Sequence, residues 1–266
     1  MPTSHCNGAD LYYEDRGSGQ PIVFLHGAWA GIRFFEQQLT ALSADHRTIA
    51  FDFRGHGRSE KTDGGHTVRG YARDLRAFLE YHSLDDVVLV GWSLGALVSW
   101  EYVDQFGTDR IGALVNVDME SSPARWDEDG DGRYDADRLR EIHGNVQEDH
   151  WDFVERTQLQ LCKEPPSTTV RTMMFDETTR CPPAIKSAII LDATLQDYRD
   201  TLPEIDVPTL VCAGADEKWR TVAVVEDTAE RIPRARFEPF ENSGHCLFIE
   251  EAERFNRLLR EFVESV

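Results

Sequence analysis

Residues 88–96, VLVGWSLGA, constrain the fold of this chain more than any other segment. An apolar run typical of a buried strand breaks into glycine, serine and glycine at a spacing of two, and the sequence then continues as the helix-like LGALVSWEYV. A strand that passes directly into a helix needs a sharp turn, and Gly91 and Gly95 lack the side chains that would hold the two elements apart. Five-residue matches also arise by chance, so the pattern fits either a plain turn or a reactive serine at Ser93.

The rest of the sequence favours the second interpretation, because short apolar runs alternate with helix-like segments. The expected strands are residues 21–27, 47–55, 86–91, 111–119, 207–214 and 234–241, and the expected helices are residues 34–43, 71–82, 94–106, 222–232 and 250–263. Alternation of this kind is typical of a parallel sheet with helices on both faces. In such a sheet, reactive groups gather outside the carboxyl ends of the strands, where Ser93 is expected to lie.

The alternation stops near Met119 and resumes at residue 204. The segment between these points is polar and rich in aspartate, and where it shows any period the period is that of a helix. We therefore predict an α/β fold with a mostly parallel, doubly wound sheet formed by residues 1–119 and 204–266, and an inserted helical cap formed by residues 120–203.

Composition excludes several classes of protein. A formal net charge of −20 opposes binding to nucleic acid or to an anionic membrane surface. The five cysteines are odd in number and scattered, which is not typical of a disulfide framework or a zinc site. No long apolar run and no export signal are present, so we expect a cytoplasmic protein, either a monomer or a homodimer.

A serine hydroxyl is a poor nucleophile until a base removes its proton, so Ser93 needs a histidine and an acid that orients it. Among nine histidines, His245 lies on a glycine-bearing loop, ENSGHCLF, between an expected strand and the last expected helix. His26 and His56 also lie in loops, but their sequences, HG after a strand and RGHGRS after another, are typical of structural turns. We predict His245 as the base.

The order of HGAW, DFRGHGRS, GWSLGA, GADEKW and SGHC along the chain resembles the α/β-hydrolase superfamily over nearly the whole sequence. Within it, LYYEDRGSGQPIVFLHG and the small size resemble the cofactor-free haloperoxidases, esterases and lactonases. The resemblance implies the α/β-hydrolase fold, a nucleophile, acid and histidine in this chain order, and no required cofactor.

The resemblance also implies an oxyanion hole formed by the backbone amides of Leu94 and Ala28. The position of Leu94 suits this role physically, because the amides that begin a helix are free and the helix dipole favours negative charge there. Trp29 and Trp92 are candidates for lining the substrate pocket, although Trp29 could equally belong to the core.

The identity of the acid stays open between three carboxylates. The family usually places its aspartate three residues beyond the glycine of GADEKW, which would be Glu217, whereas a loop one residue shorter would restore Asp216. We favour Asp216 because the shorter carboxylate is the usual partner of the imidazole. Asp118, after the preceding strand, is held in reserve.

The cap contains DEDGDGRYDADR, residues 127–138, which resembles a calcium loop. Arg138 occupies the position where a bidentate glutamate is expected, so a solvated acidic turn is the alternative. The candidate ligands of this structural calcium are Asp127, Asp129, Asp131 and Asp135.

Together these features predict a serine hydrolase for a small or medium carboxylic ester or lactone. Hydrolysis of a carbon–carbon bond, or a perhydrolase or haloperoxidase activity, would use the same triad. A protein of this fold that only binds ligands is the alternative from another class. Cap residues that could shape the pocket or the cap core are Trp126, Trp151, Phe153, Met173, Met174 and Phe175.

Overall fold

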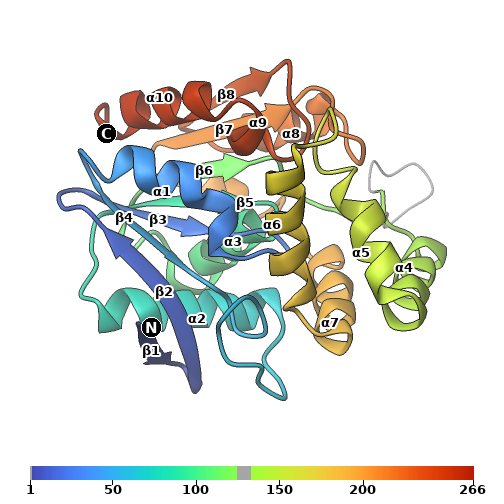
Figure 1. Cartoon of the computed structure of the whole chain (residues 1–266). Helices are drawn as coiled ribbons and strands as arrows, with labels where there is room; N and C mark the ends of the chain where they lie inside the picture. The colour runs from blue at the N-terminus through green and yellow to red at the C-terminus, as the bar shows by residue number, and fades with distance from the viewer. Residues whose placement is uncertain (1, 125–132) are drawn as a thin grey trace.

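The computed structural model describes residues 2–124 and 133–266, which form an eight-stranded sheet with helices on both faces (Figure 1). The strand order is β1-β2-β4-β3-β5-β6-β7-β8. The strands are β1 (Thr3–Cys6), β2 (Ala9–Arg16), β3 (Pro21–Leu25), β4 (Arg47–Phe51), β5 (Val87–Trp92), β6 (Ile111–Val117), β7 (Thr209–Gly214) and β8 (Ala235–Phe240).

The sheet is parallel from β4 to β8, as the alternation of elements predicted. The edge near the N-terminus differs, because β1 and β2 form an antiparallel pair and β2 also runs antiparallel to β4. This pair was not among the expected strands. Its sequence mixes apolar and charged residues, as suits an edge that is only partly covered.

Helices cover the two faces of the sheet in two groups. Helices α2 and α3 pack on one face with α8, and α1 and α10 pack on the other (Figure 1). The described helices are η1 (Ile32–Phe35), α1 (Glu36–Leu42), α2 (Val68–Tyr81), α3 (Leu94–Phe106), α4 (Ala136–Glu148), α5 (His150–Gln158), α6 (Thr168–Thr179), α7 (Pro183–Thr194), η2 (Leu202–Glu204), α8 (Val222–Glu230), α9 (Leu247–Glu250) and α10 (Ala252–Val263).

Side chains on the central strands alternate between two apolar clusters. On β3, Val23 and Leu25 belong to the cluster beneath α2 and α3, whereas Ile22 and Phe24 belong to the cluster beneath α1 and α10. All four side chains are buried, because a parallel sheet with helices on both faces leaves no strand face in water. Because both faces are covered, the loops at the carboxyl ends of the strands are where the sheet can present functional side chains.

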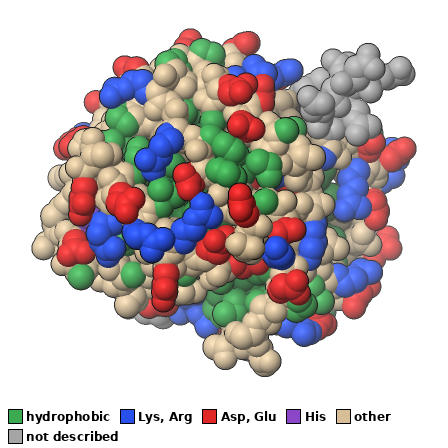
Figure 2. All heavy atoms as spheres, turned by 90° about the horizontal axis from the view of Figure 1, so that it is seen from above, with side chains coloured by type: hydrophobic (Ala, Val, Ile, Leu, Met, Phe, Trp, Pro, Cys, Tyr) green, Lys and Arg blue, Asp and Glu red, His purple; other side chains and the backbone are tan. Residues whose placement is uncertain are grey.

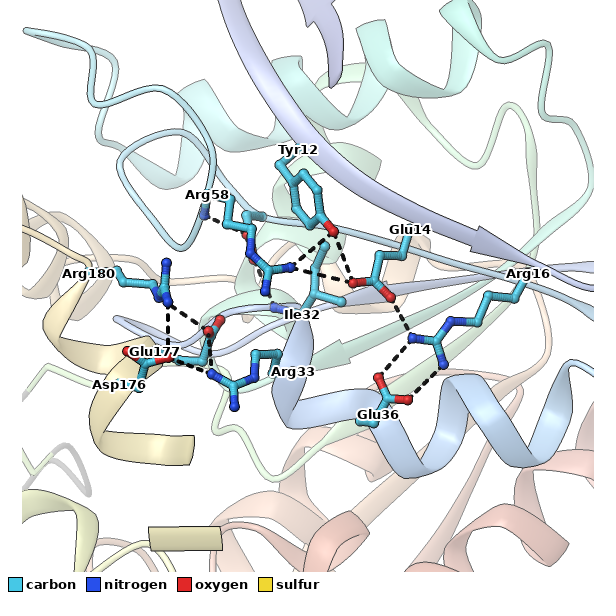
Figure 3. A network of polar contacts seen from close by, with 11 residues as sticks. Tyr12, Glu14, Arg16, Ile32, Arg33, Glu36, Arg58, Asp176, Glu177 and Arg180 are labelled. Carbon is cyan, nitrogen blue, oxygen red and sulfur yellow. Dashed lines mark hydrogen bonds and ion pairs between the residues drawn. The ribbon is translucent and has the colours of Figure 1, made fainter. Parts of the chain in front are cut away.

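Helices α4 to α7 lie between β6 and β7 in the chain, and we call the segment 120–203 the cap. Figure 3 shows how α6 meets the core at η1: Arg33 contacts Asp176 at 2.6 Å and Glu177 at 3.3 Å. Arg180 lies 3.0 Å from Asp176 and 3.4 Å from Glu177. Glu177 is buried, so its two arginine partners offset the cost of removing its charge from water.

The face of the molecule seen from above does not segregate the two signs of charge (Figure 2). On the face in Figure 2, basic and acidic side chains are interspersed around small apolar patches. Among the described residues, no helix combines the length and the apolar character needed to cross a membrane.

Strand β5 and helix α3 approach each other closely because of two glycines. A Cβ atom on Gly95 would overlap the carbonyl oxygen of Leu25 in β3, and one on Gly91 would overlap the carbonyl oxygen of Gly95. Both obstacles are backbone atoms, one at the end of β3 and one in the first turn of α3, so they cannot move aside cheaply. The spacing of these glycines is thus a packing requirement.

We predict that Gly95→Ala destabilises the protein by about 3 kcal/mol, because the new methyl group is forced against the backbone of β3. The free energy of unfolding from urea titration measures the loss. Gly144→Ala in α4 is the matched control: a Cβ there meets no atom within 4 Å, and the change should be neutral or stabilise by up to about 1 kcal/mol. Equal stability of the two variants would contradict the packing argument.

All five cysteines are free and buried. Burial raises the pKa of Cys6 to about 11 and that of Cys181 to about 12, and it also raises the pKa of Cys212 and Cys246. Because the thiolate is the reactive form, these side chains should be inert in the folded protein.

We therefore expect Ellman's reagent to modify no thiol rapidly in the folded protein and all five after unfolding in guanidinium chloride. The absorbance of the released thionitrobenzoate counts the modified groups. Rapid release of one equivalent from the folded protein would mean that a cysteine is accessible and activated.

Candidate active site

Ser93 lies at the turn between β5 and α3 with backbone angles φ 54° and ψ −115°. A positive φ is strained for a residue with a side chain, and such residues concentrate at functional sites. The backbone N–H of Ser93 donates to the carbonyl of Val117 at the end of β6, at 3.0 Å, which fixes the turn to the neighbouring strand. The structure therefore presents Ser93 where the glycine spacing predicted it.

His245 lies in the loop between β8 and α9 and is buried. Its Nδ1 atom is 2.6 Å from Oδ2 of Asp118. The indole N–H of Trp92 donates to the carbonyl of His245 at 2.9 Å, and the two rings lie 5.2 Å apart. With Nδ1 engaged by Asp118, Nε2 is the nitrogen left to accept a proton.

The other two histidines that were considered have structural partners. His26 accepts a hydrogen bond from the backbone N–H of Phe53 at 3.0 Å, and its second nitrogen contacts the carbonyl of Gly27 at 2.8 Å. His56 is fully buried and contacts the carbonyl of Arg54 at 3.1 Å. Both fit the interpretation as structural turns.

The structure does not bring Asp216, the favoured acid, to the histidine. Its side chain is exposed and forms an ion pair with Lys163 at 2.6 Å. The partner of His245 is Asp118, the carboxylate held in reserve. The backbone of Asp118 has φ 53°, and its side chain reaches His245 in the loop after β8. Its N–H donates to the carbonyl of Cys212 in β7 at 2.8 Å.

Glu217, the alternative acid, also reaches the site. Its carboxylate is buried, and Oε2 accepts the backbone N–H groups of Trp219 at 2.6 Å and Arg220 at 2.5 Å. Oε1 lies 3.7 Å from Nδ1 of His245. The loop after β7 thus turns Glu217 inward and Asp216 outward, so the shorter loop that would restore Asp216 does not occur.

Arg220 is a residue of this site that the sequence reasoning missed. Its buried guanidinium donates through Nη1 to the carbonyl of Asp118 at 2.7 Å and lies 3.0 Å from Nδ1 of His245. It also forms an ion pair with Glu120, which Arg133 contacts at 2.8 Å. Arg220 lies six residues after the end of β7, in a polar loop of a chain rich in arginine, and the sequence gives no local signal of its position.

Burial dominates the electrostatics of the pair. It raises the pKa of Asp118 to about 7, against the opposing effect of Arg220, and lowers the pKa of His245 to about 3, with Arg220 acting in the same direction. Arg220 and Arg133 outweigh burial at Glu120 and lower its pKa to about 2. Because the 2.6 Å bond couples them, Asp118 and His245 titrate as a unit.

The same side chains have the chemistry of metal ligands, since one ligand atom from each of Asp118, Glu217 and His245 lies within 4.8 Å of the others. The guanidinium of Arg220 lies 3.5 Å from Asp118 and 3.9 Å from Glu217, so a positive charge already occupies the position next to these ligands. A metal cation at this position would be repelled by the guanidinium of Arg220, so these three side chains do not fit a metal centre.

A cavity of about 480 Å³ joins the turn at Ser93 to His245. Both predicted oxyanion residues, Ala28 and Leu94, line it, and so do Trp29 and Trp92. Leu94 is the first residue of α3, where amides have no partner within the helix. Trp29 has φ 65° and donates its indole N–H to the carbonyl of Lys186 in the cap at 3.2 Å.

The predicted cap residues divide between wall, core and surface. Phe153 lines the cavity and packs edge-on against Trp29, with ring centroids 5.7 Å apart. Met174 is buried in an apolar cluster, and Trp151 is 62% exposed. Met173 and Phe175 are half-buried, and Trp126 lies outside the described residues. The sequence reasoning missed the cavity-lining residues Leu97, Gln158, Leu161, Ile190, Thr194 and Trp219.

Three of the four candidate calcium ligands, Asp127, Asp129 and Asp131, lie outside the described residues. The fourth, Asp135, is the N-cap of α4, and its carboxylate accepts the backbone N–H of Arg138 at 2.8 Å. Helix capping therefore accounts for Asp135 without an ion.

Comparisons with known proteins place the whole chain among related folds and sequences. The non-heme chloroperoxidase CPO-A1 of Kitasatospora aureofaciens is 30% identical, over 97% of this chain and 98% of that protein. An esterase from Exiguobacterium antarcticum superposes with a TM-score of 0.94 at 25% identity, covering 98% of each chain. A bromoperoxidase from Bacillus anthracis superposes with a TM-score of 0.92 at 26% identity, covering 96% of each chain.

These similarities confirm the fold class and the family resemblance that the sequence motifs predicted. The alpha/beta hydrolase family matches residues 22–258, which include the turn at Ser93, the cap and His245. The chain therefore belongs to the alpha/beta hydrolase family.

Proposed function

We propose that this chain hydrolyses a small or medium carboxylic ester or lactone, with Ser93 as nucleophile, His245 as general base and Asp118 as the orienting acid. The observation that carries the proposal is the buried 2.6 Å contact between His245 and Asp118 beside the cavity that Ser93 and His245 both line. Nucleophile, base and orienting carboxylate are the three parts that acyl transfer needs.

In the first step, Nε2 of His245 takes the proton of the Ser93 hydroxyl while Oγ attacks the substrate carbonyl carbon. The electron pair of the carbonyl moves onto its oxygen, and the amides of Leu94 and Ala28 donate hydrogen bonds to this oxyanion. When the tetrahedral intermediate collapses, the bond to the alkoxy oxygen breaks, and that oxygen takes the proton from Nε2. The products are an acyl-enzyme on Ser93 and an alcohol, or a tethered hydroxyl when the substrate is a lactone.

Water completes the cycle by the same chemistry, with water as the nucleophile and Ser93 as the leaving group. His245 removes a proton from water, the hydroxide attacks the acyl carbonyl, and Ser93 leaves with the proton from Nε2. Each step uses only side chains and backbone amides of this chain, so the proposed reaction requires no cofactor.

The cavity supports a substrate of limited size. Its volume of about 480 Å³ is in the range of sites for small molecules, and aromatic side chains form part of its wall. The name of the Exiguobacterium protein, an esterase with a TM-score of 0.94, agrees with this class of substrate.

A second activity of the same triad is perhydrolysis, in which hydrogen peroxide replaces water in the second half of the cycle. The Kitasatospora and Bacillus proteins are named a chloroperoxidase and a bromoperoxidase, which favours a haloperoxidase-type activity of this triad. In the group that the sequence resembles, perhydrolase-like members often have proline at the position of Trp29. We therefore assign ester hydrolysis as the main activity. Cleavage of a carbon–carbon bond is the remaining alternative for the same triad.

We predict that Ser93→Ala lowers kcat for p-nitrophenyl esters, tested from acetate to octanoate, by at least about 10³-fold because the nucleophile is removed. A fluorophosphonate probe should label the unaltered protein and not the variant. Ser265→Ala, at the exposed C-terminal end, is the control and should keep full activity. Labelling that survives in Ser93→Ala would place the nucleophile elsewhere, and an unaltered protein that is neither labelled nor active would favour a binding protein.

We predict that Asp118→Asn lowers kcat by about 10²-fold or more, because His245 loses the carboxylate that holds its tautomer. Asparagine tolerates the positive φ at this position, so the fold should be kept. Asp216→Asn is the matched control: the side chain is exposed, its ion pair with Lys163 is a surface contact, and activity should stay within about twofold. The opposite ranking would restore Asp216 as the acid.

A further inference from the structure

Three charged groups surround Nδ1 of His245. Oδ2 of Asp118 lies at 2.6 Å, Nη1 of Arg220 at 3.0 Å and Oε1 of Glu217 at 3.7 Å. A single carboxylate suffices to hold an imidazole in one tautomer. The second carboxylate and the arginine therefore need an explanation of their own.

Glu217 is held in place by one of its oxygens only. Oε2 accepts two backbone N–H groups of its own loop, those of Trp219 and Arg220. Oε1 is buried and has no hydrogen-bond partner within the described part of the chain, although it lies 3.7 Å from the histidine. Buried carboxylate oxygens are normally hydrogen-bonded. This oxygen has no such bond among the described residues, so its negative charge is left to act on the imidazole.

Arg220 links the loops that carry the two carboxylates. Nη1 donates to the backbone carbonyl of Asp118, and the guanidinium lies 3.9 Å from Oε1 of Glu217. Because Nδ1 donates its proton to Asp118, it cannot also accept from Nη1, and the 3.0 Å approach of Arg220 is a repulsion for an imidazolium. The arginine thus makes a charged histidine less favourable.

Among the described residues, and with every group ionised, the charges around the histidine balance to one negative unit. The negative groups are Asp118, Glu120 and Glu217, and the positive groups are Arg133 and Arg220, which each pair with Glu120. If Glu217 were neutral, the balance would be zero, with Arg220 facing the ring. Because an imidazolium forms when Ser93 gives up its proton, the remaining negative unit would come from Glu217.

We propose that Glu217 is a second positioning carboxylate of His245: Asp118 accepts its hydrogen bond, Glu217 supplies the net negative charge that stabilises the imidazolium, and Arg220 holds both carboxylates at the ring. This inference rests on the proposed function. No additional proton moves, since Nδ1–H stays on the histidine and Glu217 acts through its field alone.

The pH dependence of kcat/KM separates this role from a structural one. The acid limb of the profile reports uptake of a proton by the coupled pair of His245 and Asp118, which abolishes the base. Removing the negative charge of Glu217 disfavours the imidazolium and moves the limb to lower pH, whereas removing the positive charge of Arg220 moves it to higher pH. A nearby charge of this kind shifts a pKa by about one unit or more.

The experiment measures profiles of kcat/KM for p-nitrophenyl acetate with the unaltered protein, Glu217→Gln, Arg220→Gln, Arg220→Lys and the double variant Glu217→Gln/Arg220→Gln. We expect Glu217→Gln to lower kcat about tenfold and to move the acid limb down by about one unit. Arg220→Gln should move the limb up, and Arg220→Lys should leave it unchanged. The double variant restores the balance of one negative unit, so its limb should return toward that of the unaltered protein.

Limbs that move in the same direction, or a double variant whose shift is no smaller than those of the single variants, would overturn the proposal. If the melting curve shows that Arg220→Gln does not fold, the acid limb of Glu217→Gln is compared with that of Arg220→Lys. An unmoved limb in Glu217→Gln then overturns the role of Glu217. In that case the loss of activity in Ser93→Ala still tests the proposed function separately. Activity retained by Ser93→Ala would refute the proposed function itself and remove the basis of the inference.

Discussion

The buried contact between His245 and Asp118 depends on three loops that meet at one edge of the sheet. These loops follow β6, β7 and β8, which are neighbours in the strand order and run parallel, so their carboxyl ends lie side by side. Backbone hydrogen bonds join the loops in turn: Asp118 donates to Cys212 at 2.8 Å, and Asp216 donates to Ser243 at 3.0 Å. The position of the imidazole is therefore set by the sheet.

Burial makes this arrangement effective and also costly. A carboxylate removed from water is stable only when it is paired or hydrogen-bonded, and the site buries Asp118, Glu120 and Glu217 together. The compensation comes from Arg220, from Arg133 and from backbone amides of the loop after β7. In such a low-dielectric environment each charge acts strongly on the histidine, which is why one glutamate can matter without touching the substrate.

The cap is related to the core in a different way. It contributes cavity walls through α5 and α7, and it is joined to η1 by the ion pairs of Arg33 with α6 (Figure 3). The catalytic groups that we propose come from the sheet edge and from residue 28, and none comes from α4 to α7. Substitutions in α4 to α7 can thus change the cavity while the proposed triad keeps its geometry.

The sequence by itself determined the features that rest on local chemistry. The glycine spacing around Ser93 follows from the close approach of β5 and α3, and alternating apolar and helical periodicity led to the parallel sheet. His245 could be predicted because it lies in a loop between a strand and a helix. The antiparallel strands β1 and β2 were missed, since their mixed composition has no clear period.

Only the tertiary structure decided which carboxylate meets the histidine. Asp118, Asp216 and Glu217 all follow strands of the same edge, and the chain order does not say which side chain turns inward. That choice depends on a positive φ at Asp118, on the direction of the loop after β7, and on Arg220, which contacts a carbonyl 102 residues away. Contacts between distant loops leave no periodicity or spacing in the sequence, because each loop by itself is satisfied by water until the fold brings them together.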